Sequence, residues 1–146
     1  MKVSTRGEYA LRALIILGQR PNTVVPIAEI AEKTLVPVNY LEQILLQLKN
    51  LGYVKSKRGI RGGYTLRKSP ELIVIGEVIR QLEGPLAPMG CVSITAYDPC
   101  SLEEGCLLKP LWTLIRDTVA YLLDHSTLED LLSGRLPSIK EDAGIK

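Results

Sequence analysis

Residues 40–66 change at Gly52 from a helical to an extended pattern, and this change constrains the fold more than any other feature of the sequence. Before Gly52, apolar side chains recur every three or four residues, which places them on one face of a helix over about residues 38–50. Those positions are Leu41, Ile44, Leu45 and Leu48. After Gly52, residues 53–56 and 64–66 have the composition of two short strands around a basic, glycine-rich loop. The segment therefore predicts a helix followed directly by a β-hairpin.

Two further helices are predicted before this segment. The first begins at Ser4 or Thr5, both good N-cap residues, and ends near Gln19. The second begins near Pro26, because proline suits the first turn of a helix. Helices and a hairpin in this order predict a winged helix-turn-helix over residues 1–83, in a chain that is mainly α with a small β wing.

The two halves of the chain carry opposite charge, although the net charge of its 146 residues is only +2. Residues 1–68 contain 12 Lys and Arg against 4 Asp and Glu, whereas residues 69–146 contain 6 against 12. A basic half joined to an acidic half indicates a module that binds a polyanion, and nucleic acid is the natural partner. For a winged helix-turn-helix the expected nucleic acid is double-stranded DNA. The sequence has no leader-like start and no apolar run long enough to span a bilayer, so we expect a cytoplasmic protein with no membrane partner.

The polar face of the third predicted helix carries side chains that can contact DNA bases. They are Asn39, Glu42, Gln43 and Gln47. An amide side chain can bond adenine through two atoms, and a carboxylate can accept a hydrogen bond from the cytosine amino group. The alternative is an ordinary solvated helix face, which is the more frequent origin of such residues taken alone. The basic hairpin that follows favours the DNA interpretation.

The loop of the hairpin combines Lys57, Arg58 and Arg61 with three glycines. An arginine on such a tip can enter a narrow minor groove, while Lys55 and Lys57 can neutralise phosphates. A nucleotide-binding phosphate loop is excluded, because no Lys-Ser or Lys-Thr pair follows the glycines and no helix is predicted there. The sequence also lacks a histidine-based triad and a paired-carboxylate motif, so it predicts a protein that is not an enzyme.

Within residues 72–83 a short apolar run leads into a helix, and the sequence predicts three further parts after it. Residues 84–109 form an irregular loop that holds all three cysteines. Residues 110–132 contain a long helix whose broad apolar stripe predicts a dimerisation surface, and a short last helix. Residues 133–146 are a polar tail.

The residues before the short last helix indicate how it begins. Ser126 is followed three residues later by Glu129, the spacing of a capping box in which each side chain bonds the backbone N–H of the other residue. We therefore expect the helix to span residues 128–132 with Ser126 as its N-cap.

Cys91, Cys100 and Cys106 are separated by eight and by five residues within the predicted loop. An odd number of thiols in a reducing compartment predicts metal binding or redox chemistry rather than a disulfide framework. Zinc sites favour pairs of cysteines two to four residues apart, and the sequence has none. An iron–sulfur cluster is the favoured interpretation, and incidental cysteines or a zinc site are the alternative.

Seven short motifs occur in one order along the chain. They are residues 4–7 (STRG), 9–11 (YAL), 40–43 (YLEQ), 51–59 (LGYVKSKRG), 62–64 (GGY), 82–85 (LEGP) and 127–131 (TLEDL). Through these motifs, residues 1 to about 132 resemble the bacterial family of winged-helix repressors typified by IscR, NsrR, RirA and CymR. The resemblance implies a homodimer that binds palindromic operators, with the third helix in the major groove and the wing arginine in the minor groove. The DNA-binding positions that it implies are Ser4, Thr5, Arg6, Asn39, Tyr40, Glu42, Gln43, Gln47, Ser56, Lys57, Arg58 and Arg61.

The same resemblance implies a cofactor. Members similar to IscR, NsrR and RirA hold an iron–sulfur cluster with three cysteines, whereas members similar to CymR lack these cysteines. The implied ligands are Cys91, Cys100 and Cys106, with a 2Fe-2S cluster favoured over 4Fe-4S. The five-residue spacing matches that of the cluster-binding members, while the eight-residue spacing is longer than the five residues found in IscR.

Lys109 stands where IscR has a histidine, three residues after the last cysteine, so the fourth ligand must come from elsewhere. In some relatives it is an acidic residue near the start of the first helix of the partner subunit, and Glu8 has that position here. The alternative is that Thr5 and Glu8 form a capping box. The implied function is a repressor that senses iron–sulfur cluster status and controls cluster biogenesis genes. A repressor responsive to nitric oxide or iron, or a cluster-free repressor regulated by a protein partner, is the alternative.

Overall fold

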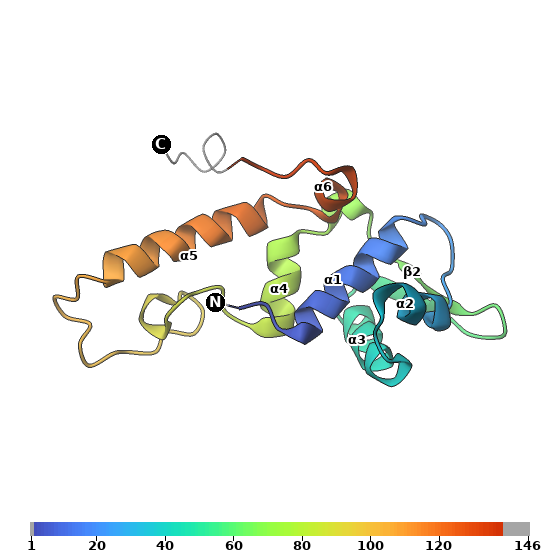
Figure 1. Cartoon of the computed structure of the whole chain (residues 1–146), viewed down its shortest axis with the longest axis horizontal. Helices are drawn as coiled ribbons and strands as arrows, with labels where there is room; N and C mark the ends of the chain where they lie inside the picture. The colour runs from blue at the N-terminus through green and yellow to red at the C-terminus, as the bar shows by residue number, and fades with distance from the viewer. Residues whose placement is uncertain (1, 139–146) are drawn as a thin grey trace.

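The computed structural model of the chain describes residues 2–138 (Figure 1). The α-helices of this part are α1 (Thr5–Gly18), α2 (Ile27–Thr34), α3 (Val38–Asn50), α4 (Ile75–Glu83), α5 (Lys109–Asp124) and α6 (Leu128–Ser133). Two strands, β1 (Val54–Lys57) and β2 (Gly63–Leu66), and two 3-10 helices, η1 (Pro70–Leu72) and η2 (Gly90–Val92), are the other elements. This mainly helical architecture with one small antiparallel sheet confirms the predicted fold class.

The N-terminal body is a cluster of three helices around one apolar core. α1, α2 and α3 pack against one another, and each contributes apolar side chains to the same buried group. Leu14 and Leu17 of α1 and Leu41 and Leu48 of α3 expose 1% of their surface or less. The apolar stripe of α3 is therefore its core face, and its polar positions are turned outward.

The wing is a short antiparallel hairpin that is fastened to the segment before α2. Val54 pairs with Leu66 and Lys57 pairs with Gly63 along the two strands. Tyr64 of β2 also exchanges two backbone hydrogen bonds with Val25, at 2.8 and 2.9 Å. Gly63 is needed at this junction, because a Cβ there would lie 2.2 Å from the carbonyl oxygen of Val25. The hairpin is thus held to the helical body on one side, and its loop projects from it (Figure 1).

The predicted cap of α6 is wrong by one residue. Thr127 is the N-cap: its hydroxyl accepts a hydrogen bond from the backbone N–H of Asp130 at 3.2 Å, and the Asp130 carboxylate accepts from the N–H of Thr127 at 2.9 Å. Ser126 is instead buried, and its hydroxyl donates to the carbonyl oxygen of Leu122 at 2.6 Å. The Ser126 side chain is directed back to the preceding helix, and the N-cap position belongs to Thr127, so the box moves from Ser126 and Glu129 to the following pair.

α5 extends away from the helical body, and Figure 1 shows α4 between it and α1. None of the α5 residues is buried, although the helix is rich in apolar side chains, and Leu111 and Leu114 expose 48% and 59% of their surface. The end of α5 near the body is held to α4 by two hydrogen bonds from the Arg80 guanidinium to the Asp124 carboxylate, at 2.5 and 2.8 Å. Gly76 permits this approach, because a Cβ there would lie 2.1 Å from Oδ1 of Asp124.

The predicted polar tail over residues 133–146 is described as far as residue 138, and residues 139–146 lie outside the described part. Ser133 ends α6, and Gly134 follows it in a left-handed conformation with φ of 73°. Within residues 2–138, no helix has both the length and the hydropathy needed to cross a membrane.

Candidate nucleic-acid interface and cysteine loop

The outward face of α3 presents three of the four side chains predicted to contact bases. Asn39, Glu42 and Gln43 are exposed, while Gln47 is half-buried. Asn39, Gln43 and Gln47 follow one another at four-residue intervals, and Glu42 lies three residues after Asn39, so all four lie along one side of the helix. Opposite them, Leu41, Ile44, Leu45 and Leu48 are held in the core. The burial pattern that fixes α3 in the body therefore also fixes which of its side chains can reach a ligand.

α3 and the wing border one open groove of about 560 Å³. Glu42 and Leu46 line it from α3, while Lys57 and Arg58 line it from the wing. Leu46 was not among the predicted site residues, although it exposes 55% of its surface. The sequence did contain a signal that Leu46 is exposed. It lies three residues after Gln43 on the outward side of α3, whereas the apolar residues that face the core lie on the opposite side. An exposed leucine on this face suits contact with a thymine methyl group.

Gln47 is held by Arg6, another of the predicted DNA-binding residues. Nε of Arg6 donates a hydrogen bond to Oε1 of Gln47 at 2.7 Å, which joins the first turn of α1 to the outward face of α3. Tyr40 is also partly engaged within the protein: its ring packs edge-to-face on Tyr9, with centroids 5.8 Å apart and an angle of 79° between the planes. The α1 and α3 candidates are therefore brought together and restrained by direct side-chain contacts.

Ser4 is the N-cap of α1, and its hydroxyl accepts a hydrogen bond from the backbone N–H of Gly7 at 3.1 Å. The same hydroxyl and the backbone N–H of Ser4 both donate to Oε1 of Glu83, the last residue of α4, each at 2.6 Å. Thr5 is exposed in the first turn. Ser4 as an N-cap is confirmed, whereas its contact with DNA stays a prediction. The sequence assigned no role to Glu83, because only the tertiary structure brings it to Ser4 across 79 positions.

Glu8 is exposed on α1, and its carboxylate accepts hydrogen bonds from Nε and Nη2 of Arg12, at 3.1 and 2.8 Å. The capping box proposed for Thr5 and Glu8 is wrong, because Ser4 occupies the N-cap position. The spacing of a capping box places its acidic partner at Gly7 once the cap moves to Ser4. Glu8 therefore has no capping role, and the exposed ion pair with Arg12 is the only hydrogen-bonded contact of its carboxylate among the described residues.

The wing presents its four predicted DNA-binding side chains to solvent. Ser56, Lys57, Arg58 and Arg61 are all exposed. Ile60, at the tip between the two arginines, is fully exposed and was missing from the predicted site. Its signal was an apolar residue in an otherwise basic and glycine-rich loop. Guanidinium groups beside an apolar tip are the combination with which proteins enter a minor groove.

The cysteine loop does not gather its three thiols around one point. Cys91 and Cys106 are half-buried, and Cys100 is exposed. Within the part of the chain that the structure describes, no three His, Cys, Asp or Glu side chains are grouped so that they could hold a metal ion. Three thiolates fit an iron–sulfur cluster in chemical type. Their arrangement does not fit one, because the loop would have to change conformation to bring them together.

Lys109 is engaged within the loop. Its ammonium group donates to one carboxylate oxygen of Glu103, and the other oxygen accepts from the Tyr97 hydroxyl. Hydrogen bonds from Lys109 and then from Tyr97 lower the pKa of Glu103, and the bond to Glu103 raises the pKa of Lys109. A lysine held in its protonated form has no lone pair for a metal, so this position cannot replace the histidine of IscR.

Sequence comparison relates the chain to a family of regulators. The family model named Rrf2, described as an iron-dependent transcriptional regulator, matches residues 3–134. CymR of Bacillus subtilis is 39% identical over 137 residues, which are 91% of this chain and 91% of CymR. NsrR of Bacillus licheniformis is 36% identical over 133 residues, which are 90% of this chain and 92% of NsrR.

Comparison of structures gives the same relationship. The structure of B. subtilis CymR, described as a global cysteine regulator, superposes with a TM-score of 0.78 at 38% identity and covers 92% of this chain and 98% of its own. The structure of T. potens IscR superposes with a TM-score of 0.72 at 31% identity and covers 100% of this chain and 93% of its own. The similar proteins therefore come from both branches that the sequence resemblance distinguished.

Proposed function

The chain belongs to the Rrf2 family of transcriptional regulators and is not an enzyme, and from that premise we propose that it is a homodimeric repressor of palindromic operators whose DNA binding responds to an iron–sulfur cluster. The proposal places the protein in the cytoplasm with its operators, which control genes of iron–sulfur cluster biogenesis.

The groove shared by α3 and the wing is the observation that carries the DNA-binding part. On one side of it lies a helix face with polar side chains that can bond base edges. On the other side the wing offers Lys57, Arg58 and Arg61, all exposed, in the basic half of the chain. A recognition helix and a basic hairpin on the same side of the body can contact a major groove and the adjacent minor groove together.

The exposed apolar face of α5 supports the dimer. Leu111, Leu114 and the loop residues Leu107 and Leu108 each expose 48% of their surface or more. An apolar stripe on a projecting helix is stabilised when a second copy covers it. A dimer through α5 would present two recognition helices related by a two-fold axis, which is the symmetry of a palindromic operator.

The chemical type of the three thiols supports the cluster, and the loop would have to change conformation to bring them together. Cys91, Cys100 and Cys106 supply soft thiolate ligands of the kind that hold iron–sulfur clusters, and a 2Fe-2S cluster is favoured. Glu8 of the partner subunit is the proposed fourth ligand, and it would have to exchange its contact with Arg12 for the metal. When bound, the cluster would supply a group that can be lost or oxidised in the presence of oxidants or nitric oxide or when iron is scarce.

Two alternatives within the family follow from the same observations. A repressor responsive to nitric oxide or iron would use the same ligands, as the similarity to NsrR suggests. A cluster-free repressor regulated by a protein partner is favoured by the similarity to CymR and by the separation of the thiols.

Purification without oxygen, followed by visible absorption and by iron and acid-labile sulfide analysis, tests the cluster. Both elements and a coloured protein are expected, and Cys91→Ser, Cys100→Ser and Cys106→Ser should each lose them. Glu8→Ala should change the absorption spectrum, while Glu104→Ala, an exposed residue of the same loop as the cysteines, is the matched control. A colourless protein that cannot be reconstituted with iron and sulfide would favour the cluster-free repressor. Selection of a palindromic duplex from random DNA tests the DNA-binding part separately.

A further inference from the structure

Glu83 ends α4, and the chain passes from it through Gly84 into the cysteine loop. Its side chain does not point along that loop but reaches the start of α1. Oε1 of Glu83 accepts two hydrogen bonds from Ser4, from the backbone N–H and from the hydroxyl, each at 2.6 Å. One carboxylate oxygen therefore fixes both the backbone and the side chain of the α1 N-cap.

The contact continues into the first turn of α1. The Ser4 hydroxyl donates to Glu83 and accepts from the backbone N–H of Gly7 at 3.1 Å, so the carboxylate, the hydroxyl and the helix N–H form one chain. A negative charge at this end of the helix interacts favourably with its dipole. Gly7 is part of the arrangement, because a Cβ there would lie 2.1 Å from Oε1 of Glu83. Glycine at position 7 therefore leaves free the space that the Glu83 carboxylate occupies.

The turn that Glu83 fixes is also the turn that carries Arg6. Nε of Arg6 donates to Oε1 of Gln47 at 2.7 Å, and Gln47 lies on the outward face of α3. Ser4, Arg6 and Gly7 fall within four consecutive residues, so the position of the N-cap determines where the Arg6 side chain begins. Two short hydrogen-bonded contacts thus connect the end of α4 with the candidate base-reading face.

We propose that Glu83 is a positioning residue for DNA recognition: by fixing the Ser4 cap it orients Arg6, and through Arg6 it orients Gln47. The inference rests on the proposed DNA-binding function and assigns to this residue a part in its specificity. Glu83 touches no DNA itself, since its carboxylate faces the start of α1.

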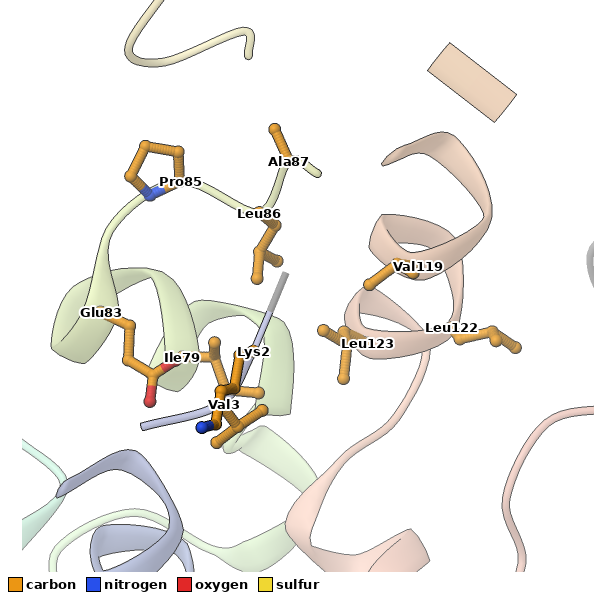
Figure 2. Close-up of a pocket in the computed structure, with 10 residues that line it drawn as sticks. All are labelled: Lys2, Val3, Ile79, Glu83, Pro85, Leu86, Ala87, Val119, Leu122 and Leu123. Atoms are coloured by element: carbon orange, nitrogen blue, oxygen red, sulfur yellow. The ribbon is translucent and has the colours of Figure 1, made fainter. Parts of the chain in front are cut away.

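Glu83 also borders a cavity of about 300 Å³ that the first residues of the cysteine loop help to form. Figure 2 shows Glu83, Lys2 and Val3 on one side of this cavity, Val119 and Leu123 of α5 on the other, and the loop residues Pro85 to Ala87 above. A shift of the loop relative to α5 would therefore act on the residues that hold the cap. The loop is therefore connected to α3 through the Glu83–Ser4 and Arg6–Gln47 hydrogen bonds.

A double-mutant cycle tests the proposal on the full-length protein, with a duplex that the wild type selects from random DNA as the probe. Glu83→Ala should lower affinity for this duplex on the order of tenfold, within the range of coupling between residues of one hydrogen-bonded network. In a Gln47→Ala background the same substitution should cost little more, because the side chain that Glu83 positions is already absent. Affinity for an unrelated duplex should stay unchanged.

Glu83→Gln is the conservative variant, since its amide oxygen can still accept both hydrogen bonds from Ser4. Glu83→Gln should therefore regain most of the affinity for the selected duplex that Glu83→Ala loses. Ser4→Ala keeps the backbone N–H but removes the hydroxyl, and it should show the same coupling to Gln47→Ala. If Glu83→Ala does not fold, Ser4→Ala takes its place in the double-mutant cycle. Thermal unfolding of each variant identifies any loss of fold.

Two results would overturn the proposal: an unchanged affinity in Glu83→Ala and Ser4→Ala, or a loss of equal size with and without Gln47. Either result, with a wild type that selects and binds a duplex, leaves the proposed function intact and removes the inference alone. A wild type that selects no sequence would overturn the proposed function and the inference together.

Discussion

Arg6 on α1 donates a hydrogen bond to the amide oxygen of Gln47 on α3, with Nε and Oε1 2.7 Å apart. This hydrogen bond occupies the amide oxygen of Gln47, so the amide nitrogen is the part of the side chain that can bond a base. Bonding of adenine through two atoms needs a donor and an acceptor presented side by side. Gln43, which is exposed one turn earlier, has both ends of its amide available.

Gln43→Ala should therefore relax discrimination at one base pair of each half-site. We expect a loss of about 1–3 kcal/mol in binding free energy for the preferred base and little change for the other three. Gln47→Ala should alter base preference less, since its acceptor is engaged with Arg6. Binding to a panel of operators with single base changes measures both effects. Equal losses on every duplex would show that Gln43 contributes no sequence information.

Arg58→Ala should weaken binding, because we propose that this exposed wing arginine enters the minor groove. We expect a loss of about 1–3 kcal/mol. If the guanidinium also neutralises a phosphate, the slope of log affinity against log salt should fall by roughly one. Arg135→Ala, which removes an exposed arginine just after α6, is the control and should bind as the wild type does. An unchanged Arg58→Ala affinity would indicate that the wing is only a solvated hairpin.

Leu114→Glu should convert the proposed dimer into a monomer. Leu114 exposes 59% of its surface on α5, and a second copy covering it would place the new carboxylate in an apolar interface. Leu114→Met keeps the apolar character at the same position and should remain dimeric. Sedimentation equilibrium at matched protein concentration separates the two. A Leu114→Glu variant that stays dimeric would place the interface elsewhere.

Tyr53→Phe should change both stability and its dependence on pH. Tyr53 is 1% exposed and its hydroxyl donates to Gln81, so the loss of this bond should cost about 1 kcal/mol. Burial, and then the charge of Glu77, raises the pKa of Tyr53 above its ordinary value. The neutral phenol therefore contributes stability that is present below the ordinary tyrosine pKa and is lost as pH rises through the higher folded value.

Urea unfolding of the wild type and Tyr53→Phe over a range of alkaline pH measures this contribution. The difference in free energy of unfolding should be constant up to about pH 9 and should decrease above about pH 10. Comparison of the two proteins removes the background titration of lysines, including Lys68, whose ammonium lies 5.1 Å from the Tyr53 ring centroid. A difference that is independent of pH would contradict a tyrosinate cost in the folded state.

The sequence was most informative where local periodicity and burial agree. It predicted α3 over residues 38–50, and the structure has Val38–Asn50. Its four core residues are buried because a helix with apolar side chains at three- and four-residue spacing can bury only that face. The wing was predicted for a similar reason, since two runs of strand-forming residues flank a glycine-rich loop within a short local segment.

Sequence reasoning failed where two candidates lay one residue apart. Ser126 with Glu129 and Thr127 with Asp130 have the same capping spacing, and the choice depends on the hydrogen bond from Ser126 to the carbonyl of Leu122. The capping alternative for Glu8 failed in the same way, because the acidic group that serves the α1 N-cap comes from Glu83. Leu46 and Ile60 were missed because exposed apolar residues look like core residues until their surroundings are known.

The sequence by itself determined the helices, the wing and the separation of a basic half from a cysteine-bearing half, because periodicity, turn residues and charge are local properties of the chain. Only the tertiary structure decided that Glu83 holds Ser4, the N-cap of α1, that Arg6 holds Gln47, and that the three thiols lie apart in this conformation. These relationships join residues as many as 79 positions apart. They depend on how the elements pack, since hydrogen bonds act over a few ångströms in space and carry no signal in the spacing of residues along the chain.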